Sequence, residues 1–243
     1  MSGRQPSRRD ALALGLGWFP FFHKNHVGLE GARFRILRRG KAWRRFLVIH
    51  GNEETARAVL TEFMESRDGV AYLVEGHTRN VQVEGLQLDP NRMFSRVGAE
   101  ASLRRLNRGA DEAQVKRALD KLDRGREALV REFTPPKGGL TFALHNNSES
   151  YSVESEVAIS DETSLKERGN PHAFFLCTDP KDFAVLRTSP YNVVLQQKAP
   201  PEDDGSLSRL AARRGFRYLN LEVRLGQGDK QREMMWWVEW NLA

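Results

Sequence analysis

The chain has 243 residues, of which 40% are hydrophobic and 29% are charged. This length and balance fit one α/β domain with a substantial core and argue against a second full domain. The net charge of +6 is spread along the chain, and no nucleic-acid recognition motif accompanies it, so we expect no nucleic-acid partner. The single cysteine, Cys177, cannot form an intrachain disulfide, and we expect it to pack in the core.

The N-terminal segment, residues 1–30, differs from the rest of the chain. Arg8 and Arg9 precede the apolar stretch 13–22, which resembles a twin-arginine export signal and predicts transfer to the periplasm. The stretch is too short for an ordinary membrane-spanning helix of about 20 residues, and we expect no transmembrane segment elsewhere. Its aromatic residues and Pro20 leave a second interpretation, an arm that covers the surface of a cytoplasmic protein. Residues 31–243 are then expected to form one domain.

Strands and helices alternate along the first half of that domain. Apolar runs and apolar residues at helical spacing distinguish the two kinds of element. We expect strands at 32–37, 45–49, 70–74 and 140–145, helices at 53–66, 99–107 and 111–133, and a long loop at 75–95.

The second half continues in the same way. We expect strands at 173–177, 192–197 and 216–225, a loop at 199–205 and a helix at 206–214. This alternation predicts an α/β fold with a mostly parallel mixed sheet and helices on both faces. Such sheets bind ligands beyond the carboxyl ends of their strands.

Two of the expected strands end in residues that can bind a metal ion. The first runs into His50, Gly51, Asn52 and Glu53, and the second ends at His145. Two histidines and one carboxylate form a zinc site with an open position for water, which indicates hydrolysis. The alternative is that His50 is a core histidine and Glu53 a carboxylate favoured by the dipole of the following helix.

These residues resemble a known family, the zinc carboxypeptidase superfamily, and in particular its succinylglutamate desuccinylase and aspartoacylase branch. The resemblance rests on three elements in the expected order. They are the His50-Gly51-Asn52-Glu53 run, the loop from Arg79-Asn80 to Asp89-Pro90-Asn91-Arg92-Met93-Phe94, and His145. It implies a zinc-carboxypeptidase-like fold over most of the chain.

The resemblance also implies a role for each matching residue. The ligands of Zn²⁺ would be His50, Glu53 and His145. Asn91 and Arg92 would bind a substrate carboxylate, and Arg79 would stabilise the oxyanion of the scissile carbonyl. The general base would be Glu222, with Glu239 as the rival candidate.

Several of these residues have other interpretations. Arg92 could form an ion pair with Asp89, and Glu222 could form one with Arg217 or Arg224. His77 and His172 are candidates for a substrate contact or a replacement ligand. Tyr151 could close over a substrate, although an exposed loop tyrosine is the simpler expectation. The run Met234-Met235-Trp236-Trp237 is expected to pack in the core or on an edge strand.

The sequence therefore predicts a single zinc-hydrolase catalytic domain at 31–243 that cleaves an amide bond near a free carboxylate. Peptides and N-acyl amino acids both fit as substrates. One alternative is a non-catalytic binding module that keeps the carboxypeptidase-like fold. Another is a protein that binds anions or nucleic acid through its basic surface. The sequence carries no information on the oligomeric state.

Overall fold

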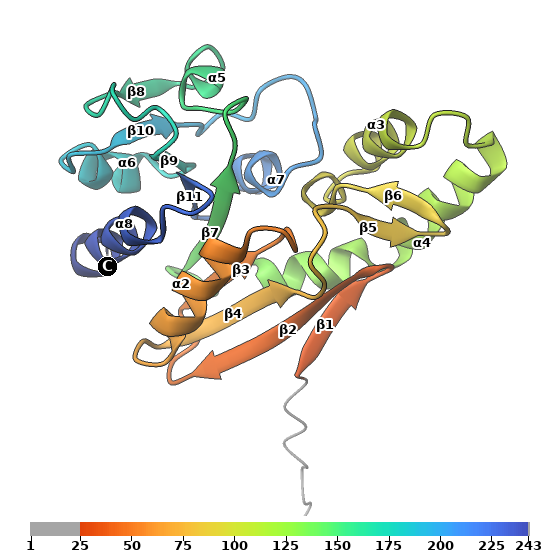
Figure 1. Cartoon of the computed structure of the whole chain (residues 1–243), viewed down its shortest axis with the longest axis horizontal. Coiled ribbons are helices and arrows are strands. Elements are labelled where there is room, and N and C mark those ends of the chain that lie inside the picture. The colour runs from red at the N-terminus through yellow and green to blue at the C-terminus, as the bar shows by residue number, and fades with distance from the viewer. Residues whose placement is uncertain (1–24, 243) are drawn as a thin grey trace, which may run out of the picture.

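A nine-stranded sheet runs through the described part of the chain, residues 25–242 of a computed structural model (Figure 1). The predicted export signal, at 13–22, lies outside these residues. The strand order is β1-β2-β4-β3-β7-β11-β9-β10-β8. The bounds are β1 His26–Leu29, β2 Ala32–Arg39, β3 Arg44–Val48, β4 Gly69–Val74, β7 Leu140–Asn147, β8 Glu162–Ser164, β9 Phe174–Cys177, β10 Asn192–Leu195 and β11 Tyr218–Arg224.

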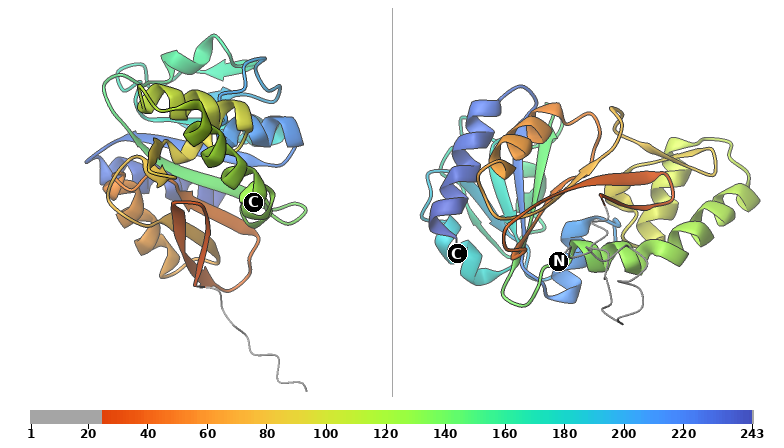
Figure 2. Two further views of the ribbon diagram at one scale, coloured as in Figure 1. Left: turned by 90° about the vertical axis from the view of Figure 1, so that its right-hand side faces the viewer. Right: turned by 90° about the horizontal axis from the view of Figure 1, so that it is seen from below.

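The helices cover both faces of this sheet, as expected (Figure 2). One face packs against α2 Glu54–Met64, α6 Pro180–Leu186 and α8 Gly228–Asn241, and the other against α4 Glu112–Phe133 and α7 Leu207–Arg214. Helix α3 Arg96–Leu106 packs instead on α4 and on the short strand β6 Leu86–Leu88 (Figure 1). The short helix α5 spans Glu154–Val157. No helix within 25–242 is both long enough and apolar enough to cross a membrane.

The expectation of a mostly parallel sheet is wrong. Strands β4, β3, β7 and β11 form a parallel centre, and β9 is parallel to β10. The remaining neighbours in the sheet, β1 with β2, β2 with β4, β9 with β11 and β8 with β10, are antiparallel. One cause is local: Glu30 and Gly31, the latter with φ of 76°, connect β1 to β2 in a tight hairpin rather than through a helix.

Alternation along β7 assigns its side chains to the two faces. Phe142 and Leu144 pack with α2 and α8, whereas Ala143 packs on the opposite face. His145 follows with the same parity as Ala143, so it shares that second face. Cys177 is fully buried among the apolar residues of the first face, as predicted.

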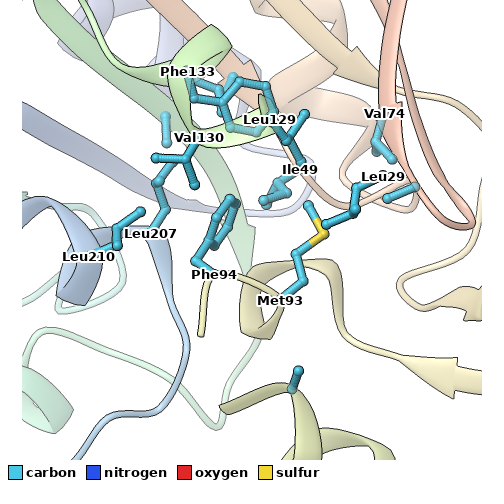
Figure 3. Packing of buried hydrophobic residues seen from close by; sticks show 14 of the residues in the cluster. Leu29, Ile49, Val74, Met93, Phe94, Leu129, Val130, Phe133, Leu207 and Leu210 are labelled. Atoms are coloured by element: carbon cyan, nitrogen blue, oxygen red, sulfur yellow. The ribbon is translucent and has the colours of Figure 1, made fainter. Parts of the chain in front are cut away.

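The second face is closed by α4, which packs near the loop that follows β6. Its side chains Leu129, Val130 and Phe133 lie close to Ile49 and Phe94 in one cluster (Figure 3). Asp111 caps the helix by accepting a hydrogen bond from the backbone of Gln114 at 2.6 Å. Each fully buried apolar side chain, such as that of Leu129 or Phe133, contributes roughly 1.5–3 kcal/mol to the stability of the fold. This packing holds the 89–94 loop beside the end of β3.

Two other expectations need correction. The segment expected to be a long loop contains a hairpin, β5 Val81–Val83 with β6 Leu86–Leu88, and the 3₁₀ helix η1, Pro90–Arg92. Glu84, with φ of 52°, and Gly85, with φ of 76°, form the tight turn of the hairpin. The Met234 to Trp237 run was expected in the core or on an edge strand: Met234 and Met235 are buried in the core, as expected, but the run lies on helix α8 and the edge-strand alternative is wrong.

Candidate active site

The three predicted ligands meet at the carboxyl ends of β3 and β7. His50 follows β3, Glu53 immediately precedes α2, and His145 lies within β7. All three are buried, and each offers one ligand atom within 4.8 Å of the other two. The Oε1 atom of Glu53 lies 2.7 Å from Nδ1 of His50 and 3.2 Å from Nδ1 of His145. The structure thus brings together residues that are 92 positions apart in the sequence.

Gly51 explains how the chain turns between the first two ligands. A Cβ atom at this position would lie 2.6 Å from the carbonyl oxygen of Thr78 and 2.8 Å from that of Gly76. The Gly51 amide donates to the Thr78 carbonyl at 3.0 Å. The glycine is therefore needed because two backbone segments approach closely, and not because it adopts a positive φ.

Asp89 is a site residue that sequence reasoning missed. Its Oδ1 atom lies 2.8 Å from Nε2 of His50, on the ring edge opposite Glu53. The same oxygen accepts the backbone amide of Asn91 at 2.9 Å, which fixes the carboxylate at the start of η1. A carboxylate behind a metal-binding histidine orients the ring and raises its basicity. The sequence signal lies in the Asp-Pro-Asn-Arg run, where Asp89 was expected only as a possible ion-pair partner of Arg92.

The charges of this cluster stabilise one another. Burial disfavours the imidazolium of His50, but Glu53 and Asp89 outweigh burial and raise its pKa to about 9. Burial likewise opposes ionisation of Glu53, yet His145 and His50 lower its pKa to about 2. The pKa of Asp89 is lowered against burial by its hydrogen bond to His50. Both carboxylates are thus held as anions.

The residues present fit a zinc ion. Imidazole nitrogens and a carboxylate oxygen are common zinc ligands, and three protein ligands leave a position open in a catalytic site. The Oε2 atom of Glu53 is buried and has no hydrogen-bond partner among residues 25–242. An ionised buried carboxylate with an unpaired oxygen is costly, and a cation beside it would remove that cost.

A cavity of about 630 Å³ opens beside this cluster. We call it the site cavity. Its lining includes all seven predicted site residues, namely His50, Glu53, Arg79, Asn91, Arg92, His145 and Glu222.

Glu222 lies on β11 directly opposite His145 in the strand register. It is buried, and burial raises the pKa of its carboxyl group. Its Oε1 atom accepts a hydrogen bond from Asn220 at 3.0 Å, a contact that the sequence did not indicate. Of the two expected ion-pair partners, Arg224 binds Glu149, and Arg217 binds Asp182 at the other end of the strand.

The rival base, Glu239, lies elsewhere. It is on α8, where it forms ion pairs with Arg44 and Arg67, and it does not line the site cavity. The structure therefore places Glu222, and not Glu239, beside the candidate metal ligands.

Arg79 and Asn91 line the site cavity from the segment 75–95. The guanidinium of Arg79 is 3.4 Å from Asp89 and 3.8 Å from Glu53, and its side chain is about half exposed. Asn91 accepts the backbone amide of Leu207 through Oδ1 at 3.1 Å, which ties η1 to the start of α7. Arg79 is thus anchored by the carboxylates of the cluster, while Asn91 connects two segments of the cavity wall.

Arg92 does not pair with Asp89. Its Nη1 atom lies 3.2 Å from Oδ2 of Asp204, a residue of the 199–205 loop. Asp204 also lies 3.8 Å from Nε of Arg209, at the start of α7. Both Asp204 and Arg209 line the site cavity, and the sequence indicated neither.

The remaining candidates take other positions. His77 is exposed and does not line the site cavity. His172 is buried, with Nδ1 2.8 Å from the Tyr151 carbonyl oxygen, and is not part of the metal cluster. Tyr151 lines the site cavity, and its hydroxyl group donates to Glu156 at 2.8 Å, so it is not an exposed loop tyrosine.

No protein-family model, curated protein or solved structure matches the chain.

Proposed function

We propose that the chain is a zinc-dependent hydrolase that cleaves an amide bond near a free carboxylate, by a mechanism like that of the zinc carboxypeptidases. The observation that carries the proposal is the convergence of His50, Glu53 and His145 at a cavity whose wall contains Glu222. A zinc ion bound by the three residues would act as a Lewis acid and would lower the pKa of water toward about 7.

Glu222 is the proposed general base. The pKa of its carboxyl group is raised toward neutral pH, where a group both accepts and donates protons effectively. It takes a proton from the attacking water molecule and passes one to the leaving amine. Asn220 holds Oε1 by its hydrogen bond and so orients the carboxylate.

The arginines bind the negative charges of the reaction. Arg79 lies beside the cluster and stabilises the charge that develops on the scissile carbonyl oxygen. Arg92 binds the free carboxylate of the substrate, for which a guanidinium offers charge-assisted hydrogen bonds. Peptides with a free C-terminus and N-acyl amino acids both carry the required amide and carboxylate.

The metal is tested first by elemental analysis of the purified chain. We expect about one zinc per chain, because three protein ligands of suitable type converge. The His50→Ala variant should lose stoichiometric zinc and remain folded, whereas the matched variant His77→Ala should retain it, because His77 is exposed and lies outside the cluster. Equal zinc retention by the wild type and His50→Ala would show that the ligand set is wrong.

The substrate is tested with a panel of peptides and N-acyl amino acids, each as the free acid and as the amide. Amidation removes the charge-assisted contact to Arg92 and should cost on the order of 2–5 kcal/mol in the transition state. Activity on the amides should thus be lower by orders of magnitude. Equal rates on acids and amides would exclude the role of Arg92, and binding without any hydrolysis would favour a non-catalytic binding module.

A further inference from the structure

We propose that Arg92 and Arg209 together form one carboxylate-binding subsite, and that Asp204 occupies this subsite until the carboxylate of a substrate replaces it. The inference rests on the proposed function, because it concerns the carboxylate that the hydrolase would recognise. It adds Arg209 to the binding residues and assigns a role to the 199–205 loop.

The first observation is that one carboxylate lies between two guanidinium groups. Oδ2 of Asp204 is 3.2 Å from Nη1 of Arg92, and Oδ1 is 3.8 Å from Nε of Arg209. All three side chains line the site cavity. The carboxylate is therefore placed where a substrate carboxylate would have to bind in order to reach Arg92.

The second observation is that Arg209 has a donor to spare. Its side chain is only 11% exposed, and its Nη1 atom is buried without a hydrogen-bond partner in the described part of the chain. Its ion pair with Asp204 is long, at 3.8 Å. A buried guanidinium nitrogen without an acceptor is costly, and an incoming carboxylate would supply the missing acceptor.

The third observation is that the two neighbouring aspartates of the loop differ. Asp203 accepts hydrogen bonds from the Gly205 amide at 3.0 Å and from Arg213 at 2.8 Å, and neither Asp203 nor Arg213 lines the site cavity. Asp204 accepts the Ser206 amide at 2.9 Å through Oδ1. Both aspartates thus stabilise the turn, but only Asp204 places a charge between the cavity arginines.

A single exchange follows from this arrangement. The substrate carboxylate binds Arg92 and Arg209, and Asp204 moves away from them into solvent, which its one-third exposed side chain already contacts. The net charge of the subsite is unchanged by the exchange. Asp204 therefore lowers the affinity for carboxylates while it keeps two buried or half-buried arginines neutralised in the free protein.

The experiment measures binding of phenylacetate, which has one carboxylate, and of phenylethanol, its uncharged analogue, by calorimetry on the zinc-loaded full chain. Asp204→Asn keeps an oxygen for the Ser206 amide and removes the competing charge, so phenylacetate should bind about ten-fold tighter than to the wild type. The affinity for phenylethanol should not change. Asp203→Asn is the matched control and should leave both affinities unchanged.

A second pair of variants tests the arginine. Arg209→Gln should weaken phenylacetate binding about ten-fold, because one of the two guanidinium contacts is lost. Arg213→Gln, on the same helix but outside the cavity, should have no effect. Thermal unfolding of each variant checks that the fold is intact, and Asp204→Ala serves as a replacement if Asp204→Asn does not fold.

The outcomes separate this inference from the proposed function. If phenylacetate is preferred over phenylethanol, but Asp204→Asn brings no gain or Arg209→Gln no loss, the shared subsite is overturned and a carboxylate site elsewhere in the cavity remains. If neither the wild type nor Asp204→Asn prefers phenylacetate over phenylethanol, both this inference and the carboxylate preference of the proposed hydrolase are wrong. The same conclusion follows if neither of these two proteins binds phenylacetate.

Discussion

The three parallel strands β3, β7 and β11 have buried or half-buried carboxylates at both ends, and the carboxylates at the two ends differ in how they are paired. At the amino ends, Arg44 binds Glu239 and the Leu242 carbonyl, and Arg217 binds both oxygens of Asp182. Beyond the carboxyl end of β3, Oε2 of Glu53 is buried without a partner in the described chain, and so is Oδ1 of Asn220, which lies within β11 and lines the site cavity.

This difference is the one expected between a structural cluster and the proposed functional one. Buried polar groups are nearly always paired, since an unpaired one costs free energy. The amino-end carboxylates Asp182 and Glu239 follow that rule, whereas Nε and Nη1 of Arg45, the second residue of β3, are also buried without partners in the described chain but lie outside the site cavity. The carboxyl-end groups break it at a cavity, which is where an open sheet binds its ligands. The following variants test whether the two ends are as different in function as they are in hydrogen bonding.

The largest effect is expected from Glu222→Gln. A general base contributes roughly 10²–10⁴-fold to the rate without binding the metal, so turnover should fall by that factor while zinc content and phenylacetate binding remain. Glu239→Gln, at the opposite end of the strands, should leave turnover within a few-fold of the wild type. Steady-state kinetics on the best free-acid substrate measures both. Loss of activity in Glu239→Gln alone would reverse the assignment of the two ends.

A variant at the amino ends of the strands should lower the stability of the fold rather than the catalytic rate. Arg217→Ala leaves the buried carboxylate of Asp182 without its bidentate partner, which typically costs about 3–5 kcal/mol of the free energy of unfolding. Urea denaturation measures this cost, with Arg232→Ala as the control, because the ion pairs of Arg232 are exposed and should be worth about 1 kcal/mol or less. A cost for Arg217→Ala no larger than that of the control would remove the distinction between the ends.

Asp89→Asn tests whether the carboxyl end is built around a metal. Residues that orient a ligating histidine typically affect metal affinity by about 10–100-fold, and we expect a loss in that range with the fold retained. Competition with a chelator measures zinc affinity. Asp204→Asn is the matched variant, since it lines the same cavity but contacts none of the proposed ligands, and its zinc affinity should equal that of the wild type. Equal affinities in all three proteins would contradict the role of Asp89.

The smallest effect concerns pH and a buried hydroxyl group outside the site. Burial raises the pKa of Tyr72 to about 12, and its hydroxyl donates to the Glu132 carbonyl at 2.9 Å. Because the folded-state pKa lies above the ordinary tyrosine value near 10, the stability from this group is complete below about pH 10 and is lost as pH rises toward about 12.

Between about pH 9 and about pH 11 this loss should be on the order of 1 kcal/mol. Urea denaturation across this range, compared with Tyr72→Phe, isolates the contribution, since phenylalanine has no group to ionise. An identical pH dependence in both proteins would mean that the Tyr72 hydroxyl does not contribute.

The sequence predicted the metal cluster because its signals are local. His50 and Glu53 follow an apolar strand, His145 lies at the end of the apolar run of β7, and such runs can be recognised from a few neighbouring residues. Most strands and helices were found for the same reason. The direction of β9 relative to β11 was not, because parallel and antiparallel pairing of a buried strand leave the same apolar run in the sequence. For β2 the signal was present but unused, since its residues alternate between buried and exposed as in an antiparallel strand with one solvated face.

The parts of the cavity that were missed depend on contacts between distant residues. Asp204 reaches Arg92, and Leu207 reaches Asn91 across 116 positions, so no short motif carries either contact. The Met234 to Trp237 run was expected in the core, where Met234 and Met235 lie, but its edge-strand alternative was wrong for a different reason. Bulky aromatic residues favour strands intrinsically, whereas the buried positions Gln231, Met234, Met235 and Val238 follow helical spacing.

The central place of β7 in the sheet has a consequence for the order in which the protein forms. β7 pairs with β3, which lies nearly a hundred residues earlier, and with β11, which lies over seventy residues later. Such long loop closures make folding slow relative to helical proteins of similar size. Glu222 joins His50 and His145 only after β11 has paired, so the ligands can meet in a nascent chain well before the base arrives. In the proposed hydrolase, binding of a metal ion during synthesis should therefore precede the onset of activity.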